Sequence, residues 1–235
     1  MAPPDPQPRW TAEIALRIRR YVLLKLVGTT AFTSLFFVGY FELLRHPVHP
    51  VVVMPLTALD RLIPFQPLTL FAYLSLWVYI GVAPGLQLTF IELIVYGLWI
   101  GALCLTGLAM FYFWPTAVPP MMPDVSGYAG FAMLQGVDAA GNACPSMHVA
   151  VAMFSVLWVE HLLRQARVPP GLRLFNLGWF LAIVYSTLAI KQHVVLDVVA
   201  GALLGTAFAW PSLVWRPSPR RPSRAGVGLN IMEPR

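Results

Sequence analysis

The sequence predicts an all-α, polytopic membrane protein in which six transmembrane helices form one bundle. Of the 235 residues, 58% are hydrophobic and only 11% are charged, and the mean hydropathy is +0.69. A soluble domain carries about a quarter charged residues, so this composition belongs to a bilayer. Six apolar segments come close to or exceed the about 20 residues that one membrane crossing needs.

The six predicted spans follow a proline-rich start and a basic stretch. The first ten residues, MAPPDPQPRW, cannot build a core, whereas the next ten, TAEIALRIRR, predict a short helix at the membrane interface. The second span is short for a full crossing. The predicted spans are residues 21–44, 68–83, 88–114, 146–163, 174–190 and 194–215.

Three parts follow from this pattern. We expect a cytoplasmic N-terminal segment at residues 1–20, a six-helix membrane domain at 21–215 that holds the catalytic residues, and a solvated tail at 216–235, which is rich in Pro, Ser and Arg. Cys104 falls inside an apolar run and Cys144 outside one, so we expect no disulfide between them.

Charge placement predicts the orientation. The basic residues gather in the N-terminal segment, in the loop between the fourth and fifth spans, and in the tail, which six spans put on one side of the membrane. The positive-inside rule makes that side cytoplasmic. The loop 115–145 then lies outside, with Asp124 and Asp138 but no Lys or Arg. The net charge of +6 is thus a topology signal for a multi-pass inner-membrane protein, and not a nucleic-acid footprint.

Two stretches place histidines at the outer, periplasmic ends of predicted spans. ACPSMHVAVAM puts His148 at the start of the fourth span, and STLAIKQHVVLD puts His193 and Asp197 at the start of the sixth. His193 and Asp197 are four residues apart, on one face of a helix. A carboxylate there fixes the imidazole tautomer and makes the other ring nitrogen more nucleophilic. The alternative is a structural hydrogen bond that only tethers the sixth helix.

The start of the fourth span has the features of an anion site. Ser146 is the predicted N-cap, and the free N–H groups around Met147 attract negative charge. His148 could donate a proton to a leaving oxygen, or could simply cap the helix. Lys191, the only basic residue of its loop, could hold a phosphate oxygen, or could snorkel to water. Ser146, Met147 and Lys191 are therefore the candidates for substrate binding.

CPSMH and STLAIKQHVVLDVVAG resemble the second and third signature motifs of the type 2 phosphatidic acid phosphatase superfamily, which read P-S-G-H and S-R-x5-H-x3-D. The resemblance covers residues 68–215. The matching positions are Pro145, Ser146 and His148 in the second motif, and Ser186, His193 and Asp197 in the third.

The resemblance implies a metal-independent phosphatase or phosphotransferase that acts on a membrane lipid phosphate and needs no cofactor. It implies that His193 attacks phosphorus and forms a phosphohistidine, that Asp197 orients His193, and that His148 protonates the leaving alkoxide and then deprotonates the acceptor. The sequence itself offers no cluster of metal ligands.

Three departures accompany the resemblance. Met147 stands in the glycine position of the second motif, and Thr187 in the arginine position of the third. The first motif, K-x6-R-P, is missing where the third span ends, and FYFWPTAVPPMM stands there instead. The KQHVVLD form looks closer to the inositol phosphorylceramide synthase-like branch, which implies a lipid phosphotransferase as the alternative to a hydrolase.

Other classes stay open as alternatives. A non-catalytic membrane scaffold would fit the missing arginines. A small-molecule transporter fits less well, because the polar residues cluster at one surface and not at the middle of the bilayer. A vanadium-dependent oxidase lacks its basic cradle. Gly201 and Gly205 form a small-xxx-small pattern, which predicts close helix packing.

Overall fold

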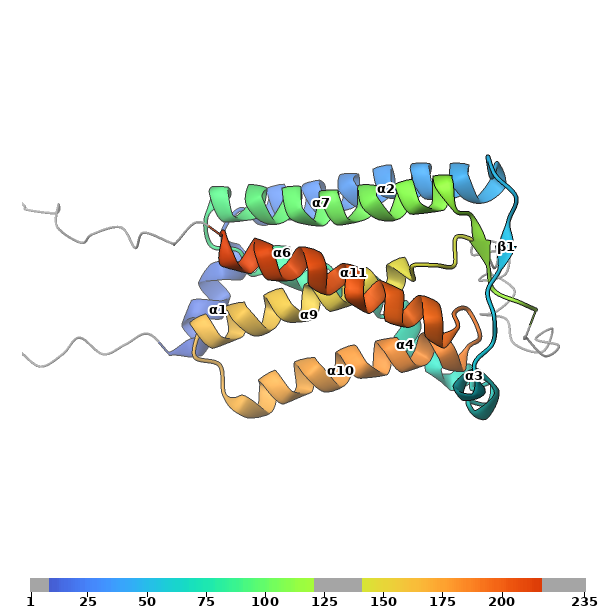
Figure 1. Cartoon of the computed structure of the whole chain (residues 1–235). Coiled ribbons are helices and arrows are strands. Elements are labelled where there is room, and N and C mark those ends of the chain that lie inside the picture. Colours follow the sequence, from blue (N-terminus) through green and yellow to red (C-terminus); the bar gives the residue numbers. More distant parts are fainter. Residues whose placement is uncertain (1–8, 121–140, 217–235) are drawn as a thin grey trace, which may run out of the picture.

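The computed structural model describes residues 9–120 and 141–216, which form a bundle of membrane-length helical segments (Figure 1). Six such segments are present, which confirms the predicted all-α class and the number of spans. They are α2 (Val22–Arg45), the broken segment Pro67–Gly85, α7 (Phe90–Phe113), α9 (Met147–Gln165), α10 (Pro170–Ala189) and α11 (Val195–Val214).

The second span is a series of short helices and not one regular helix. It consists of η1 (Pro67–Thr69), α4 (Leu70–Leu74), α5 (Leu76–Tyr79) and α6 (Val82–Gly85). The Ser75 hydroxyl donates to the carbonyl of Ala72 at the first break, and Gly81 occupies the second. A serine side chain that bonds a nearby backbone carbonyl weakens a regular helix, and so does a glycine. The short apolar pattern of this span thus reflects a real irregularity.

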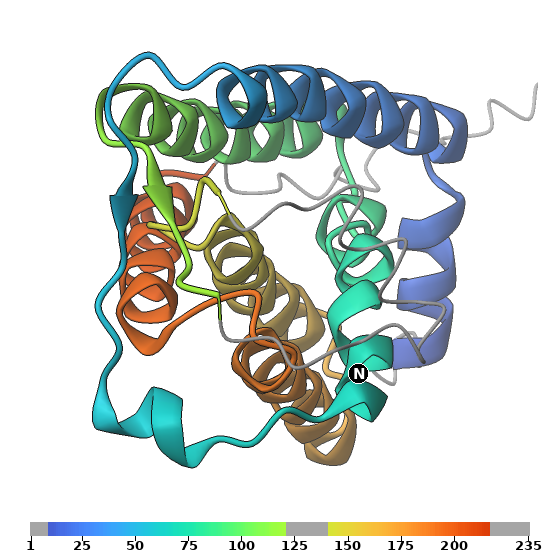
Figure 2. The same ribbon diagram turned by 90° about the vertical axis from the view of Figure 1, so that its right-hand side faces the viewer.

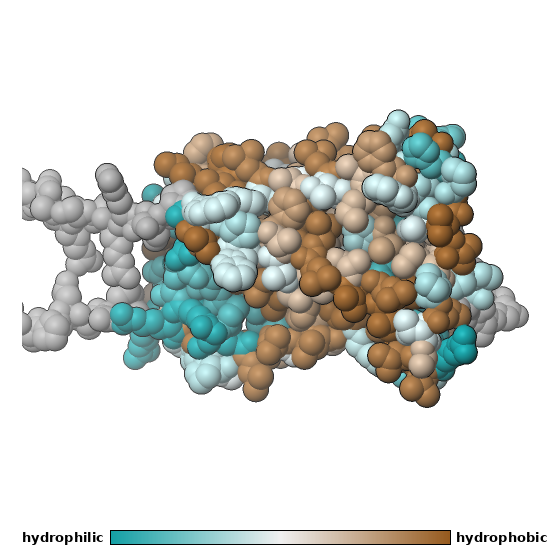
Figure 3. Space-filling model, in the orientation of Figure 1, coloured by the Kyte–Doolittle hydropathy of each residue, from teal (hydrophilic) through white to brown (hydrophobic). Residues whose placement is uncertain are grey.

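One end of the bundle, here called the terminal end, holds Arg9 and Arg216, the first and last described residues (Figure 1). The predicted interfacial helix is present as α1 (Trp10–Arg19). Lys25 fastens α1 to α2 and α6, because its ammonium donates to the carbonyls of Arg17, Gly85 and Gln87 at 2.7, 2.8 and 2.8 Å. Hydrophilic residues gather at this end, whereas hydrophobic residues cover the sides of the bundle (Figure 3).

Helix α9 occupies the centre of the bundle (Figure 2). It contacts α5, α6, α7, α10 and α11. In its most apolar 18-residue stretch 61% of the residues are buried, whereas the corresponding fraction in α2 is 6%. The helix that carries the CPSMH stretch is therefore the one around which the others pack.

Helices α9 and α11 approach so closely that their backbones touch. A Cβ atom at position 201 would lie 2.3 Å from the carbonyl oxygen of Ser146, and one at position 205 would lie 2.4 Å from that of Ala150. The Ser146 N–H also donates to the carbonyl of Asp197 at 2.9 Å. The close packing expected from the small-xxx-small pattern is confirmed.

The opposite end of the bundle, here called the motif end, contains the starts of α9 and α11 together with short extended segments. β1 (Val52–Val53) and β2 (Thr116–Ala117) form a parallel two-stranded sheet, which the sequence did not predict. On its other edge, Thr116 accepts hydrogen bonds from the backbone of Ala143 and Cys144. A short helix, α3 (Ala58–Leu62), completes this end. Of the predicted tail 216–235, all but Arg216 lies outside the described residues.

Replacing Gly201 by Ala should lower the free energy of unfolding by about 1–3 kcal/mol, because the new methyl group meets backbone that cannot move aside. Thermal unfolding of the purified protein in detergent measures the loss. Gly178→Ala in α10 is the matched control, since a Cβ there meets nothing within 4 Å. Equal unfolding temperatures for the two variants would contradict the close contact.

Candidate active site

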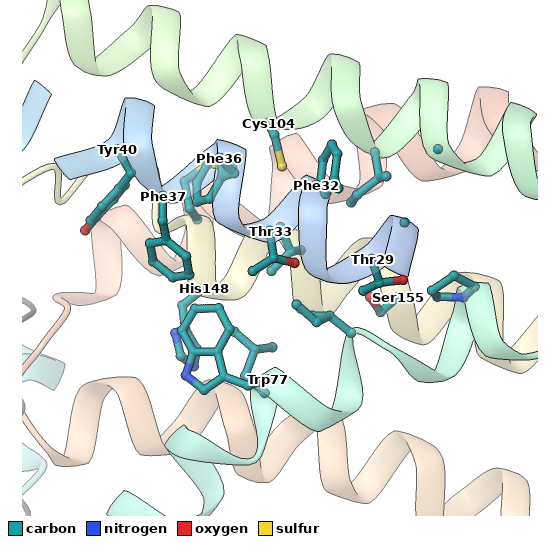
Figure 4. A pocket seen from close by; sticks show the side chains of 18 of the residues that line it. Thr29, Phe32, Thr33, Phe36, Phe37, Tyr40, Trp77, Cys104, His148 and Ser155 are labelled. Atoms are coloured by element: carbon teal, nitrogen blue, oxygen red, sulfur yellow. The ribbon is translucent and has the colours of Figure 1, made fainter. Parts of the chain in front are cut away.

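The structure brings the predicted histidines to one cavity at the motif end. His148 comes from the first turn of α9, and His193 from the turn between α10 and α11. Both line the same cavity of about 770 Å³, which α2, the second span, α7 and α9 enclose. Figure 4 shows His148 beside Trp77 at this cavity, opposite the aromatic side chains of α2. Their predicted convergence is therefore present in the fold.

His193 and Asp197 form a buried pair. The Nδ1 atom of His193 lies 3.3 Å from Oδ2 of Asp197, and the Asp197 side chain is fully buried. Since a carboxylate only accepts, Nδ1 carries the ring proton and the lone pair of His193 is on Nε2. The second carboxylate oxygen of Asp197 is buried with no hydrogen-bond partner among the described residues. A buried carboxylate with so little compensation costs stability, which makes Asp197 a candidate site residue.

His148 is held by a backbone carbonyl and by an aromatic ring of the second span. Its Nε2 atom lies 3.1 Å from the carbonyl oxygen of Tyr73, and its ring stacks on the Tyr73 ring with centroids 4.0 Å apart. The Trp77 ring packs edge-to-face with the His148 ring, with their centroids 6.0 Å apart. Because a carbonyl can only accept, Nε2 is the protonated nitrogen, and Nδ1 is the atom that can exchange a proton.

Asp60 is a functional candidate that sequence reasoning missed. Its Oδ1 accepts the backbone N–H of Val195, the first residue of α11, at 2.8 Å. Its Oδ2 accepts the N–H and the hydroxyl of Thr57, both at 2.7 Å, in a capping box that starts α3. Val194, the N-cap of α11, has no capping side chain, so Asp60 caps that helix from a distant segment. The pattern Thr57-x-x-Asp60 signals the capping box but not its second partner.

Lys191 lies next to Asp60 and is directed at backbone. Its ammonium donates to the carbonyls of Asp60 and Ile63 at 3.0 and 2.5 Å. Burial lowers the pKa of Lys191, and the Asp60 carboxylate partly opposes that change. Two of its three donors thus stabilise the loop of α3, and its role in substrate binding stays a prediction.

Ser146 and Met147 shape the start of α9. The Ser146 hydroxyl accepts the N–H of Val149 at 3.3 Å, so Ser146 is the N-cap that the sequence predicts. The N–H groups of Met147 and His148 belong to the first turn, where a helix supplies no acceptor. The Met147 side chain lies against Gly107 of α7, where even a Cβ atom would be 2.2 Å from its sulfur. Gly107 thus makes room for the residue in the glycine position of the motif.

The residues that stand where the family motifs have basic side chains form hydrogen bonds that hold the loops of the site. Thr116, in β2, binds the residues just before Pro145, as described above. Thr187, in the arginine position of the third motif, is buried and its hydroxyl donates to the carbonyl of Val184. Its own carbonyl accepts the N–H groups of Gln192 and His193 at 3.2 and 3.1 Å. Both positions therefore fix the loops that carry the histidines, without adding positive charge.

Cys144 lies close to the His193–Asp197 pair. Burial, together with the negative charge of Asp197, raises the pKa of the Cys144 thiol. Its thiol is therefore neutral at physiological pH and a poor nucleophile. Cys104 and Cys144 are both free cysteines. Within residues 9–120 and 141–216, no group of three or more His, Cys, Asp or Glu side chains is placed to hold a metal ion.

The fold and site define a six-helix membrane protein with two histidines and a buried carboxylate at one end of the bundle. The family model of the PAP2 superfamily matches residues 113–221, a region that begins where α7 ends and contains both histidine motifs. No curated protein and no solved structure was found to match the chain. The match supports the resemblance to this superfamily over the C-terminal half, and does not distinguish the inositol phosphorylceramide synthase-like branch.

Replacing Asp60 by Ala should destabilise the protein by about 2 kcal/mol, because the N–H of Val195 and the polar groups of Thr57 lose their acceptor together. Thermal unfolding measures this loss. Limited proteolysis should show faster cleavage in the loop of α3 and in the turn before α11. Arg61→Ala, at the exposed neighbouring position, is the control and should unfold like the wild type. An Asp60→Ala protein as stable as the Arg61→Ala protein would contradict the capping role.

Proposed function

We propose that the protein is a PAP2-type lipid phosphatase that cleaves a lipid phosphate ester through a phosphohistidine on His193. The observation that carries the proposal is the geometry of the two histidines. His193 is polarised by a buried carboxylate, and His148 is fixed on the same cavity wall by the second span. The family match over residues 113–221 supports the reaction class.

In the first step, Nε2 of His193 attacks phosphorus, and the bond between phosphorus and the lipid oxygen breaks. His148 first takes a proton from solvent onto Nδ1 and then gives it to the departing alkoxide. The Nε2–H group of His148 stays bonded to the Tyr73 carbonyl, which stabilises the cationic ring before transfer. Asp197 positions His193 and stabilises the positive charge that its ring acquires.

In the second step, an acceptor hydroxyl loses its proton to Nδ1 of His148 and attacks the phosphohistidine. The nitrogen–phosphorus bond breaks, and His193 returns to its starting form. With water as acceptor the product is inorganic phosphate, and with a lipid or sugar alcohol it is a new phosphate ester. The same residues serve both outcomes, so the acceptor alone separates a hydrolase from a phosphotransferase.

The phosphoryl group would lie at the N-terminus of α9. The first-turn N–H groups at Met147 and His148 and the helix dipole supply donors and partial positive charge there. Lys191 is the only Lys or Arg between α10 and α11, and two of its donors already bind carbonyls. Binding would thus depend on oriented backbone groups more than on the arginine clamp of the family motifs.

A non-catalytic scaffold is the less favoured candidate, because it gives no reason to bury Asp197. The Asp197 carboxylate is fully buried, and one of its oxygens has no partner among the described residues. A purely structural bundle would be as well served by an apolar residue at this position.

His193→Ala should abolish phosphate release from a panel of lipid phosphates, and His148→Ala should slow it roughly 10²–10⁴-fold. Purified protein in detergent is incubated with each substrate, and free phosphate and acid-labile phosphoprotein are measured. The phosphoprotein should form in the wild type and be missing in His193→Ala. The rate of phosphate release by Asp197→Asn should lie between those of the wild type and His193→Ala, because the neutral amide cannot stabilise the imidazolium.

The matched control is His161→Ala, which removes a histidine at the other end of α9 that bonds Gln165 at 2.8 Å. It should retain wild-type activity. Equal phosphate release by the His193, His148 and wild-type proteins would refute the mechanism. Adding a lipid alcohol decides between hydrolysis and transfer, since a phosphorylated acceptor without free phosphate identifies a transferase.

We further propose that the motif end faces the periplasm or exterior and the terminal end the cytoplasm. Arg164, Arg167 and Arg173 all lie near the terminal end, whereas Asp60 is at the motif end. In a protein without its native cysteines, Val48→Cys should react with a membrane-impermeant maleimide in intact cells, and Arg167→Cys should react only after lysis. Both positions are exposed, so the reversed pattern would invert the topology.

A further inference from the structure

The cavity that begins at the two histidines continues deep into the bundle. Along α2 its lining residues run from Phe41, near the motif end, to Leu24, near the terminal end. This separation corresponds to about 26 Å at about 1.5 Å per residue, against a hydrocarbon core of about 30 Å. The cavity therefore passes the middle of the bilayer, and Lys25, bound to three carbonyls, stands at its far end.

The walls of this cavity suit a hydrocarbon tail. α2 contributes five aromatic side chains, and the second span and α7 contribute aliphatic ones, as Figure 4 shows in part. The volume of about 770 Å³ is large enough to hold at least one long hydrocarbon tail. The aromatic residues from α2 are Phe32, Phe36, Phe37, Tyr40 and Phe41.

A smaller crevice adjoins this cavity between α2 and α5. It measures about 320 Å³ and shares Thr33, Phe37 and Trp77 with the cavity wall. The centroids of the Phe37 and Trp77 rings lie 5.1 Å apart there. Helix α2 has the smallest buried share of the six membrane-length segments, at 6%. A tail could slide in from the bilayer without its phosphate leaving the membrane surface.

We infer that this cavity holds a hydrocarbon tail of the substrate, long enough to pass the bilayer midplane, which enters between α2 and α5. The inference rests on the proposed function, and it makes the substrate a lipid phosphate with a long tail. The phosphate lies at His148 and His193, and the tail runs along α2 toward Lys25. The enzyme thus selects substrates by tail length as well as by headgroup.

Two glycines allow the inner part of the cavity to be filled without disturbing the histidines. Gly28 of α2 and Gly97 of α7 both line it, and an added Cβ atom would meet nothing within 4 Å at either position. Gly97→Leu and Gly28→Leu should therefore occupy the space of the tail end. The ratio of kcat/KM for hexadecyl phosphate to that for octyl phosphate should fall about tenfold or more, because the longer tail loses its buried methylene contacts.

The matched control is Gly178→Leu in α10, where a Cβ atom also meets nothing and no cavity wall is involved. Its ratio should equal that of the wild type. An unchanged ratio in both cavity variants, or an equal fall in the control, would overturn the inference. Thermal unfolding of each variant separates a filled cavity from a damaged fold.

A binding experiment keeps the inference testable if the wild type hydrolyses neither substrate, which would count against the proposed function alone. Brominated hexadecyl phosphate should quench tryptophan fluorescence, since Trp77 lines the cavity. Gly97→Leu should weaken this binding about tenfold, whereas Gly178→Leu should leave it unchanged. Equal binding by the two variants would refute the tail site, whatever the activity.

Discussion

The contact between the backbones of α9 and α11 is the constraint on which the site depends. Gly201 and Gly205 remove the side chains that would separate the helices, and the Ser146 N–H then reaches the carbonyl of Asp197. Each helix brings one motif to this crossing. The contact of Gly201 with Ser146 lies at the start of α9, next to His148, and both histidines line one cavity.

Around this crossing, polar contacts between loops hold the two histidine motifs in place. Asp60 ties α3 to the start of α11, and Thr116 ties β2 to the residues before α9. The resulting site carries little positive charge. In the proposed reaction a dianionic phosphate would be held by helix-terminal N–H groups, whose field is short-ranged and directional.

Hydropathy predicted the class, the six spans and the end at which the histidines meet, since apolar length and i,i+4 spacing are local properties. The same local information identified Ser146 as N-cap and the glycine pair as a packing surface. It could not reveal that Asp60 caps α11 or that Lys191 bonds to carbonyls, because these contacts join segments about 130 residues apart. The breaks within the second span and the β1–β2 pair were not predicted for a similar reason, because their backbone hydrogen bonds depend on tertiary structure.

The side chain of Met147 packs against Gly107, so the residues at these two positions, on different helices, depend on each other. A glycine at 147 alone would leave a void beside α7, and a larger residue at 107 alone would collide with the methionine. The two positions are therefore coupled through the packing of α7 on the start of α9. Sequences with a glycine at position 147 are expected to carry a bulkier residue at position 107.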